Sequence, residues 1–395
     1  MVILGASGSI GRNALAVIDN LNRNSGYRFN IKALASNSNW SVTLRQIRQF
    51  RPASVIMSDH PAYLKLKSAL PPRCRTRILY GTGEIKKAVS APDVDIVISA
   101  ISGAEGLYPT LWALQSNKTV ALANKESLVM AGELLKTIKA FNKVIPVDSE
   151  HSGLFQILHN QRTPAAQACL PRHSAWRRQV KRIILTASGG PFYKLSARQL
   201  SRVTPAQALN HPTYKMGPKI TVDSATLMNK TLEIIEAHHL FNLPADKISV
   251  VIHPQSIIHA MVEFSDGSVI AQMNNPDMKL PIQYALTYPA RLPSPVKPLD
   301  FSQAHTFLKP DTKRFPALLL GYEAIRRGGT SGAVLNAANE EAVKLFLKKK
   351  VSFTDITKLV SRVVKAHKPL KATLNNINKA DQWARRQLIN ITTHL

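Results

Sequence analysis

The sequence predicts an α/β protein with an N-terminal Rossmann-type parallel sheet, a central α/β catalytic domain and a C-terminal helical bundle domain. Three observations predict this class. Short apolar runs alternate with helical stretches through residues 1–147, a glycine-rich segment follows the first run, and only helical patterns are found after residue 312. Alternating strands and helices are typical of βαβ units, which build parallel sheets.

Seven apolar runs in the first 147 residues have the length of buried strands. Helical stretches such as Arg12–Leu21 and Leu107–Gln115 lie between them. The expected strands are Met1–Leu4, Phe29–Leu34, Ser54–Met57, Arg77–Tyr80, Val94–Ser99, Thr119–Leu122 and Val144–Val147.

Residues 148–290 mix helices with Val/Ile-rich strands, such as Arg182–Leu185, Lys247–Ile252 and Ser268–Met273. We expect a second α/β domain there, followed by a proline-rich linker over residues 291–311. Residues 312–395 then form the helical domain, with helices expected over Pro316–Arg327, Ala333–Lys348, Phe353–Val364 and the last twenty residues.

The chain is strongly basic, because 52 Lys and Arg against 24 Asp and Glu give a net charge of +28. Residues 211–280 nevertheless hold five lysines and seven acids, a local charge of −2. No nucleic-acid-binding motif accompanies the basic residues, so we expect a solvated basic surface and no specific nucleic-acid partner. The alternative is a specific contact through the basic segment Gln161–Arg182.

Two cysteines, Cys74 and Cys169, exclude a disulfide framework and a thiolate zinc site. The chain begins with a strand and a glycine loop instead of a signal peptide, and no apolar run reaches membrane-spanning length. These features predict a cytoplasmic protein without a membrane partner.

The glycine-rich segment has the pattern of a dinucleotide-binding loop. It follows the first strand and opens a helix, and its residues are Gly5, Ala6, Ser7, Gly8, Ser9, Ile10 and Gly11. Glycines permit close approach of a pyrophosphate, and the helix N-terminus supplies free N–H groups. The alternative is a plain tight turn between strand and helix.

The end of the second strand indicates which dinucleotide is bound. NAD sites usually place an acid there, but this chain has Ser36, Asn37 and Ser38. A 2′-phosphate would be accepted beside these neutral side chains, which favours NADP.

Asp148 and Glu150 follow the last apolar run of the first domain. In extended chain, residues two apart point the same way, so we expect both carboxylates to project together. Such a pair repels unless a cation lies between them, and hard oxygen ligands suit Mg²⁺ or Mn²⁺. The alternative is a solvated polar turn.

A second polar cluster lies within residues 222–236. Ser224 is the expected helix N-cap, and Asn229, Glu233 and Glu236 fall on one stripe with Lys230 beside it. Amide, ammonium and carboxylate together suit a phosphorylated, metal-chelated ligand, whereas the alternative is an ordinary amphipathic helix.

Three loops carry further polar groups. The Ser188-Gly189-Gly190 turn can present a hydroxyl and N–H groups to phosphate, and residues 208–218, with His211 and Gly217, have the composition of a lid. His253 precedes a proline turn and His259 begins a strand, positions at which histidines are mostly structural.

Taken together, these segments resemble the 1-deoxy-D-xylulose 5-phosphate reductoisomerases of the non-mevalonate isoprenoid pathway. The resemblance covers nearly the whole chain. It is strongest in Gly5–Gly11, Leu122–Leu128, Val147–His151, Leu185–Phe192, His211–Glu236, His253–His259 and Asn275–Met278.

The resemblance implies a role for each matching residue. Asp148, Glu150 and Glu233 would hold the divalent metal (Mg²⁺, Mn²⁺ or Co²⁺). The substrate would be bound by Ser149 at its hydroxyls, by Ser188, Ser224, Asn229 and Lys230 at its phosphate, and by His211 closing over it. Lys125 would orient substrate and carboxylates, and His259 would support the site. Further NADPH contacts would come from Ala100, Asn124, Lys125, Glu126, Gly217 and Met278.

The reaction implied is the NADPH- and metal-dependent rearrangement and reduction of 1-deoxy-D-xylulose 5-phosphate to 2-C-methyl-D-erythritol 4-phosphate, by a homodimer. The alternatives are an NADP-dependent dehydrogenase of a phosphorylated aldehyde and a basic nucleic-acid-associated protein without catalysis. A three-carboxylate set argues against both, because neither function requires one.

The chain departs from the family pattern in the expected lid, at Tyr214, Lys215 and Pro218. It also lacks the basic residue that some members use on the 2′-phosphate, so Ser38 or Arg45 would have to replace it. The first strand is shorter than the family's. None of these departures affects the expected metal or phosphate residues.

Overall fold

The computed structural model describes residues 1–160, 179–212 and 216–393, in two compact units. Unit 1 comprises Met1–Ser127, Leu135–Asp148 and Asp277–Val296, and unit 2 comprises Leu128–Leu134, Ser149–Pro276 and Lys297–Leu395. Within the described part of the chain, no helix has the length and apolar character needed to cross a membrane.

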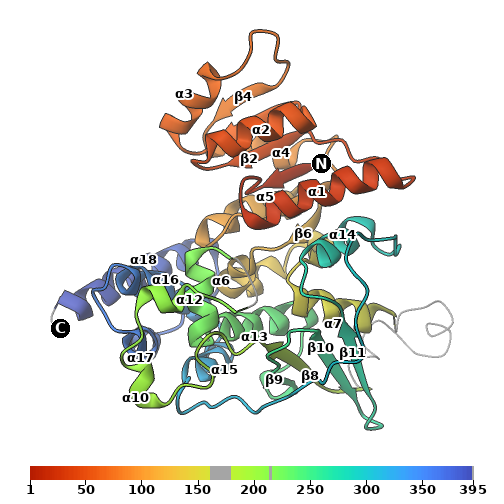
Figure 1. Ribbon diagram of the computed structural model, residues 1–395. Helices are drawn as coiled ribbons and strands as arrows, with labels where there is room; N and C mark the ends of the chain where they lie inside the picture. The colour runs from red at the N-terminus through yellow and green to blue at the C-terminus, as the bar shows by residue number, and fades with distance from the viewer. Residues whose placement is uncertain (161–178, 213–215, 394–395) are drawn as a thin grey trace. The chain divides into compact units, whose positions relative to one another are not determined.

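Unit 1 is built on a seven-stranded parallel sheet with the order β4-β3-β2-β1-β5-β6-β7, drawn in red to yellow in Figure 1. The order reverses between β1 and β5, and doubly wound sheets bind their ligands at this point. The strands are β1 (Val2–Leu4), β2 (Ala33–Ser36), β3 (Ser54–Met57), β4 (Arg77–Tyr80), β5 (Ile96–Ser99), β6 (Thr119–Leu122) and β7 (Val144–Pro146).

The predicted Rossmann-type sheet is thus confirmed, and β3, β4 and β6 have the predicted bounds. The second strand was predicted over Phe29–Leu34, which is wrong by several residues. Ala33–Ser36 is buried throughout and pairs with both β1 and β3, whereas residues 29–32 are partly or fully exposed. A strand paired on both sides in a parallel sheet is covered on both faces, and all four residues of Ala33–Ser36 are buried accordingly.

Helices connect the strands of unit 1, and the predicted helices over Arg12–Leu21 and Leu107–Gln115 are confirmed. These helices are α1 (Ser9–Asn24), α2 (Trp40–Phe50), α3 (His60–Ser68), α4 (Thr82–Ser90), α5 (Leu107–Gln115) and α14 (Lys279–Thr287), with short 3₁₀ turns at Ala104–Gly106 and Lys139–Lys143. Helix α6 (Lys125–Leu135) begins in unit 1.

Helix α14 changes the domain boundary that the sequence suggested. Its apolar residues, including Ile282 and Leu286, are buried, and the helix packs on α1, β6 and β7. Residues 277–296 therefore belong to unit 1 and not to the region 148–290 or to the linker 291–311.

Unit 2 contains a four-stranded mixed sheet with the order β11-β10-β8-β9. Strand β8 runs parallel to β9 and antiparallel to β10, and helix α7 packs across β10 and β11. The strands are β8 (Val180–Ala187), β9 (Ile248–Ile252), β10 (Ile258–Phe264) and β11 (Val269–Met273). The helices are α7 (Ser149–Asn160), α10 (Ala197–Leu200), α11 (Pro205–Ala208), α12 (Pro218–Thr226) and α13 (Met228–Phe241), with a 3₁₀ turn at Ala245–Lys247.

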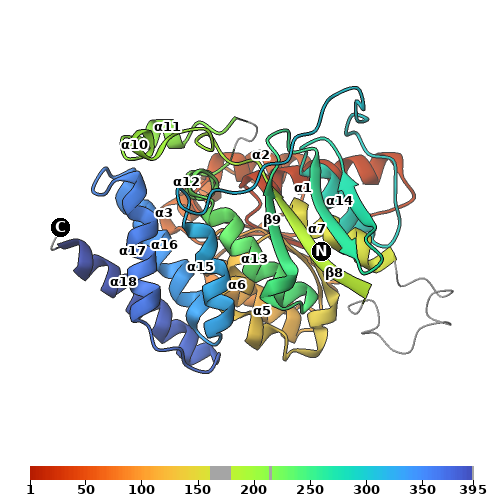
Figure 2. The same cartoon turned by 90° about the horizontal axis from the view of Figure 1, so that it is seen from below.

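Four helices complete unit 2. They confirm the predicted helical C-terminal region, but residues 312–395 belong to unit 2 and do not form the separate domain that the sequence suggested. Figure 2 shows them side by side in blue. Helix α16 packs on both α17 and α18, and α15 packs on α13. Their bounds are α15 (Ala317–Arg327), α16 (Ser331–Leu347), α17 (Phe353–Ala366) and α18 (Leu374–Thr393).

Two local predictions near the candidate site are wrong. Residues 148–150 were taken as extended chain, but α7 already begins at Ser149, so Glu150 lies in the first turn of a helix. Ser224 was expected to cap a helix, but it lies inside α12. The cap of α13 is Leu227, whose φ of +62° turns the chain between the two helices.

Some predicted features lie outside the described residues. They include Cys169, most of the basic segment Gln161–Arg182, and Tyr214 and Lys215 of the expected lid. Pro218 is described: it occupies the first turn of α12, where its missing N–H costs no hydrogen bond.

Candidate active site

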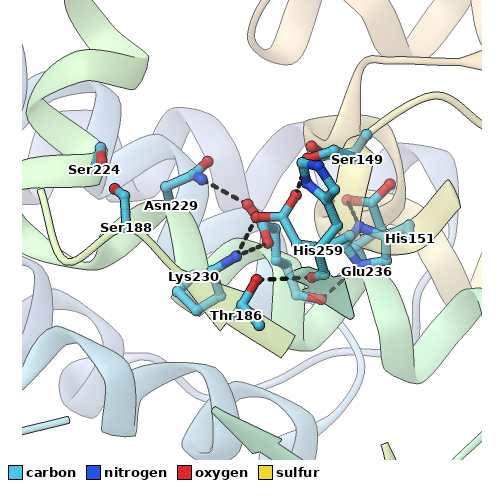
Figure 3. A network of polar contacts seen from close by, with 12 residues as sticks. Ser149, His151, Thr186, Ser188, Ser224, Asn229, Lys230, Glu236 and His259 are labelled. Atoms are coloured by element: carbon cyan, nitrogen blue, oxygen red, sulfur yellow. Dashed lines mark hydrogen bonds and ion pairs between the residues drawn. The ribbon is translucent and has the colours of Figure 1, made fainter. Parts of the chain in front are cut away.

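A buried ammonium joins two carboxylates at the centre of unit 2. Lys230 Nζ donates to Glu150 Oε1 at 2.6 Å and also to Glu233 Oε2. Asn229 Nδ2 donates to Glu233 Oε1 at 2.5 Å, and Ser149 Oγ donates to Glu150 Oε2 at 2.5 Å. Figure 3 shows the Lys230 ammonium reaching toward this group. The structure thus brings together five residues that the sequence singled out.

Helix α13 supplies three of these side chains, as the spacing predicted. Asn229 and Glu233 lie on one stripe, with Lys230 beside it. The amphipathic-helix alternative is wrong, because Lys230 and Glu233 are 2% and 0% exposed. A helix that buries its charged stripe as well as its apolar side must satisfy those charges internally.

The ammonium of Lys230 stays charged in this cluster. Burial alone would lower the pKa of Lys230, but the attraction of Glu150 and Glu233 outweighs it and raises that pKa. The two carboxylates that hold this ammonium offer oxygen atoms, which are the ligands that hard divalent cations prefer. The cluster is therefore chemically suited to a divalent cation.

An acid–histidine pair lies next to this cluster. His151 Nδ1 is 3.4 Å from Glu236 Oε2, and His151 Nε2 is 2.9 Å from the Glu233 carbonyl oxygen. His151 and Glu236 are both fully buried. Sequence reasoning placed Glu236 on the polar stripe but gave His151 no role. The sequence did contain a signal for this pair. His151 directly follows Glu150, and an acid such as Glu236 on a buried stripe needs a polar partner inside the protein.

Ser188 and Ser224 face the same histidine from two different elements. His211 Nε2 is 3.2 Å from Ser188 Oγ and 3.1 Å from Ser224 Oγ. Burial lowers the pKa of His211, which favours the neutral ring near pH 7. The arrangement collects two hydroxyls and an imidazole at one point, as Figure 3 shows for the two serines.

The turn at residues 188–190 lies directly against α12. Gly190 has φ of +65°, and a Cβ there would lie 2.7 Å from the Ser224 carbonyl oxygen. Its N–H donates to Ser188 Oγ at 3.2 Å. Only glycine permits this approach, so the predicted Ser-Gly-Gly turn brings Ser188 to Ser224.

The two later histidines are structural, as the residue pattern favoured. His253 Nδ1 donates to the Thr306 carbonyl at 2.9 Å, and its Nε2 accepts from the N–H groups of Ile257 and Ile258 at 3.1 Å each. His259 Nε2 donates to the Asn274 carbonyl at 3.2 Å. Burial lowers the pKa of both rings.

In unit 1 the glycine loop joins β1 to α1 at the reversal of the sheet. Gly5 has φ of +75°, and a Cβ there would lie 2.3 Å from the Ala100 carbonyl oxygen. A Cβ at Gly11 would lie 2.4 Å from the Gly5 carbonyl oxygen. Glycine is therefore required at both positions, and the loop leaves the N-terminus of α1 without a side-chain cap.

The end of β2 lies beside this loop, because the Ala6 N–H donates to the Ala35 carbonyl at 2.9 Å. Ser36 is buried, and its hydroxyl has no hydrogen-bond partner among the described residues. Asn37 and Ser38 are exposed. The structure thus places the two segments expected to bind the dinucleotide next to each other.

A further cluster in unit 1 lies where α6 begins and β7 ends. Lys125 forms a buried ion pair with Asp148, while Asn124 Nδ2 donates to Glu126 Oε2 at 3.0 Å. Asp148 directly precedes Ser149, so the chain joins this pair to the Glu150 cluster. Two other expected cofactor residues lie at helix starts: Met278 precedes α14 in unit 1, and Gly217 precedes α12 in unit 2.

Known families match almost the entire chain. Residues 1–132 match the family described as 1-deoxy-D-xylulose 5-phosphate reductoisomerase. Residues 144–241 match its C-terminal domain, and residues 273–387 match the DXP reductoisomerase C-terminal domain.

Individual relatives give the same result. The 1-deoxy-D-xylulose 5-phosphate reductoisomerases of Endomicrobium trichonymphae and Chlorobaculum tepidum are 47% and 48% identical, and each match covers at least 98% of both chains. A solved DOX-P reductoisomerase in complex with NADPH, fosmidomycin and magnesium is 38% identical, with a TM-score of 0.89 over 99% of this chain and 98% of that one. The Zymomonas mobilis enzyme in complex with NADPH is 40% identical, with a TM-score of 0.86 over 100% and 99% of the two chains. This chain belongs to the 1-deoxy-D-xylulose 5-phosphate reductoisomerase family.

Proposed function

We propose that the buried cluster of Glu150, Lys230 and Glu233 is the catalytic centre of an enzyme that converts 1-deoxy-D-xylulose 5-phosphate to 2-C-methyl-D-erythritol 4-phosphate. This is the reaction of the family to which the chain belongs, and it uses NADPH and a divalent metal ion. The observation that carries the residue assignment is the convergence of two carboxylates, Glu150 and the fully buried Glu233, on the buried ammonium of Lys230.

The donor set fits a hard divalent cation. Glu233 supplies a fully buried carboxylate and Glu150 a partly buried one, and Asp148 is joined to Glu150 through one residue. We assign Mg²⁺, Mn²⁺ or Co²⁺ to these three carboxylates, with Lys230 balancing their charge. When bound, the metal ion would polarise the ketone and adjacent hydroxyl of the substrate as a Lewis acid.

The remaining polar residues of unit 2 fit a phosphorylated sugar. Ser188, Ser224 and Asn229 offer hydroxyl and amide donors to phosphate, and Lys230 adds a positive charge. His211 already contacts both serines, so it can close over a bound phosphate. Ser149 is held by Glu150 and can contact the substrate hydroxyls.

Unit 1 fits NADPH. The cradle between Gly5 and Ala100 admits no side chain, and α1 presents free N–H groups to the pyrophosphate. We assign the 2′-phosphate to Ser36, Asn37 and Ser38, because no acid is present there to repel it. NADPH would supply the hydride for the reduction. We assign its remaining contacts to Ala100, Asn124, Lys125, Glu126, Met278 and Gly217. Lys125, paired with Asp148, would orient the carboxylates.

We further propose a homodimer formed through the central region. Strand β11 pairs only with β10 in the described sheet, and its Val269 and Ile270 are 51% and 42% exposed. An open strand edge with apolar side chains is a ready surface for a second copy. Sedimentation analysis of Ile270→Lys tests this, with a monomer expected.

The cytoplasmic location stays a proposal, which rests on the low cysteine content and is testable by cell fractionation.

One assay tests the function. The protein is incubated with 1-deoxy-D-xylulose 5-phosphate, NADPH and Mn²⁺, and the product is identified. We expect 2-C-methyl-D-erythritol 4-phosphate, with no turnover after chelation of the metal. NADPH oxidation that yields an unrearranged alcohol would instead support a simple dehydrogenase of a phosphorylated aldehyde.

A further inference from the structure

One residue before the serine expected to bind phosphate lies a buried acid that the proposed mechanism does not use. Asp223 lies in α12 directly before Ser224 and is 1% exposed. Its Oδ1 accepts from Asn339 Nδ2 of α16 at 2.8 Å, and its Oδ2 is 2.9 Å from Lys219 Nζ. Each carboxylate oxygen therefore has a partner, one of them more than a hundred residues away in the sequence.

Asn339 is fully buried and belongs to a helix that is itself fixed by close packing. A Cβ at Gly332, in the first turn of α16, would lie 1.9 Å from the Val129 carbonyl oxygen of α6, so the backbones of the two helices are in contact there. The amide of Asn339 must face Asp223 with its nitrogen, because a carboxylate can only accept. The contact therefore has a defined direction.

The second helix of the site is held in the same way from the C-terminal region. Thr231 Oγ1 in α13 donates to the Ala317 carbonyl of α15 at 2.8 Å. A Cβ at Gly321 would lie 2.8 Å from the Thr231 carbonyl oxygen. Helices α15 and α16 thus hold α13 and α12, which carry Ser224, Asn229 and Lys230.

We propose that Asn339 and Asp223 are positioning residues for the substrate phosphate, which they serve by fixing the α12 turn that carries Ser224. The proposal rests on the assignment of Ser188 and Ser224 to the phosphate. Ser224 is held on one side by the Gly190 turn and on the other by the Asp223–Asn339 contact. A shift of α12 would move its hydroxyl away from Ser188 and His211, while the glycine loop of unit 1 would be unaffected.

The test replaces the donor by a second acceptor. In Asn339→Asp two carboxylates face each other in a buried place, which raises the pKa of one of them and, once both are ionised, repels α12 from α16. The kinetics are therefore measured at about pH 8 or above. We expect the KM for 1-deoxy-D-xylulose 5-phosphate to rise by about tenfold or more, since one lost charged hydrogen bond is a factor of this size. The kcat should fall less than the KM rises, and the KM for NADPH should stay within about twofold.

Two further variants separate positioning from general damage. Asp223→Asn combined with Asn339→Asp restores one donor and one acceptor in exchanged positions but removes the charge that pairs with Lys219. The KM should therefore fall by about threefold or more below that of Asn339→Asp without reaching the wild-type value. Asn336→Asp is the matched control: Asn336 is equally buried on α16, but its amide donates to Glu340 of the same helix. It should lower the unfolding temperature without raising the substrate KM.

The affinity for inorganic phosphate, measured by calorimetry, gives a readout that needs no turnover. It should fall in Asn339→Asp and recover in part in the double variant even if the wild type failed to act on the sugar phosphate. That failure would refute the proposed function alone. An unchanged phosphate affinity in Asn339→Asp, or a double variant no better than the single one, would overturn the positioning role.

Discussion

The glycine loop of unit 1 and the charged cluster of unit 2 are built in opposite ways for the ligands that we propose for them. The loop works through missing side chains: Gly5 and Gly11 leave room for backbone and ligand, and no acid lies at the end of β2. The cluster works through charged side chains: Lys230 and Glu233 are almost completely buried, and Glu150, which pairs with Lys230, is partly buried. The loop is thus sensitive to volume, and the cluster to charge.

This difference has an energetic basis. A Cβ forced against backbone must displace the loop, because backbone atoms cannot rotate away as a flexible side chain can. A buried ion pair that loses one member leaves a charge without compensation, which costs about 3–5 kcal/mol. A substitution that keeps the volume but changes the charge should therefore impair the cluster and spare the loop. A substitution that adds one methyl group should impair the loop and spare the cluster.

The largest effect is expected from Glu233→Gln, which keeps the volume and removes one charge. Turnover should fall by about 100-fold or more, because metal polarisation contributes several kcal/mol to the transition state. NADPH affinity, measured by fluorescence titration, should stay within about twofold. Glu84→Gln, which removes an exposed i,i+3 ion pair with Lys87 in unit 1, is the control and should leave turnover unchanged.

If NADPH affinity fell as steeply as turnover in Glu233→Gln, the assignment of NADPH to the loop and of the metal to the cluster would be refuted. The same assay with the chelated wild type should reproduce the pattern, with turnover lost and NADPH binding kept.

Gly5→Ala makes the reverse substitution, in which volume changes and charge does not. The new Cβ would meet the Ala100 carbonyl oxygen at 2.3 Å in a conformation that disfavours side chains. We expect NADPH affinity to fall by about tenfold to 100-fold, since such strain costs about 1–3 kcal/mol. Phosphate affinity of unit 2, measured by calorimetry, should not change. Gly83→Ala is the control, because nothing lies within 4 Å of its added Cβ, and a loss of NADPH affinity there would contradict the steric argument.

The two regions also differ in how far they could be predicted. The glycine loop is a local feature, because its strand, turn and helix follow one another within about twenty residues. The spacing of its glycines is therefore enough to predict a dinucleotide-binding loop from the sequence. The α13 stripe of Asn229, Lys230 and Glu233 was predictable for the same reason, because helical periodicity determines which side chains share a face.

The predictions that failed depended on contacts between residues distant in the sequence, or on the exact residue at which a helix begins. Glu150 joins Lys230 from the first turn of α7, although the prediction placed it in extended chain. Ser224 reaches Ser188 from within α12, which no capping rule indicates. His151 is buried beside Glu236 because it contacts α13, about 80 residues later in the chain, and no local pattern reports such a contact.

Acid should affect the two units unequally. Unit 1 contains one histidine, His60, whereas burial lowers the pKa of four histidines in unit 2: His211, His253, His259 and His367. Their pKa is lower in the folded than in the unfolded protein, so the unfolded state binds more protons. The stability is present above about pH 6.5 and is lost as the pH falls through the folded values.

His253 gives this prediction a residue-level test. Protonation of its Nε2 would break two backbone hydrogen bonds, each worth about 1 kcal/mol, or about 30-fold in the folding equilibrium together. His253→Gln should therefore flatten the dependence of the free energy of unfolding on pH between 7 and 5. A slope equal to that of the wild type would show that other groups govern acid unfolding.

Ser38→Asp tests the exposed part of the unit 1 site by charge alone. A carboxylate beside the 2′-phosphate should reduce the preference for NADPH over NADH by about tenfold, because like charges that are partly desolvated repel. Steady-state kinetics with both cofactors measure the ratio. Ser41→Asp, at an exposed position two residues into α2, is the matched control and should change the ratio less. An unchanged ratio in Ser38→Asp would direct attention to Arg45.

Salt should produce the smallest effect and the clearest separation of exposed from buried electrostatics. The net charge of +28 should speed the capture of two anionic ligands, and the Debye length falls from about 10 Å at 0.1 M to about 3 Å at 1 M. We therefore expect kcat/KM for substrate and for NADPH to fall several-fold with added KCl. The kcat should change little, because Lys230 and Glu233 are buried and Glu150 is partly buried, so these charges are screened much less than exposed ones. A kcat that fell in parallel with kcat/KM would mean that salt reaches the cluster, and that its burial does not protect it.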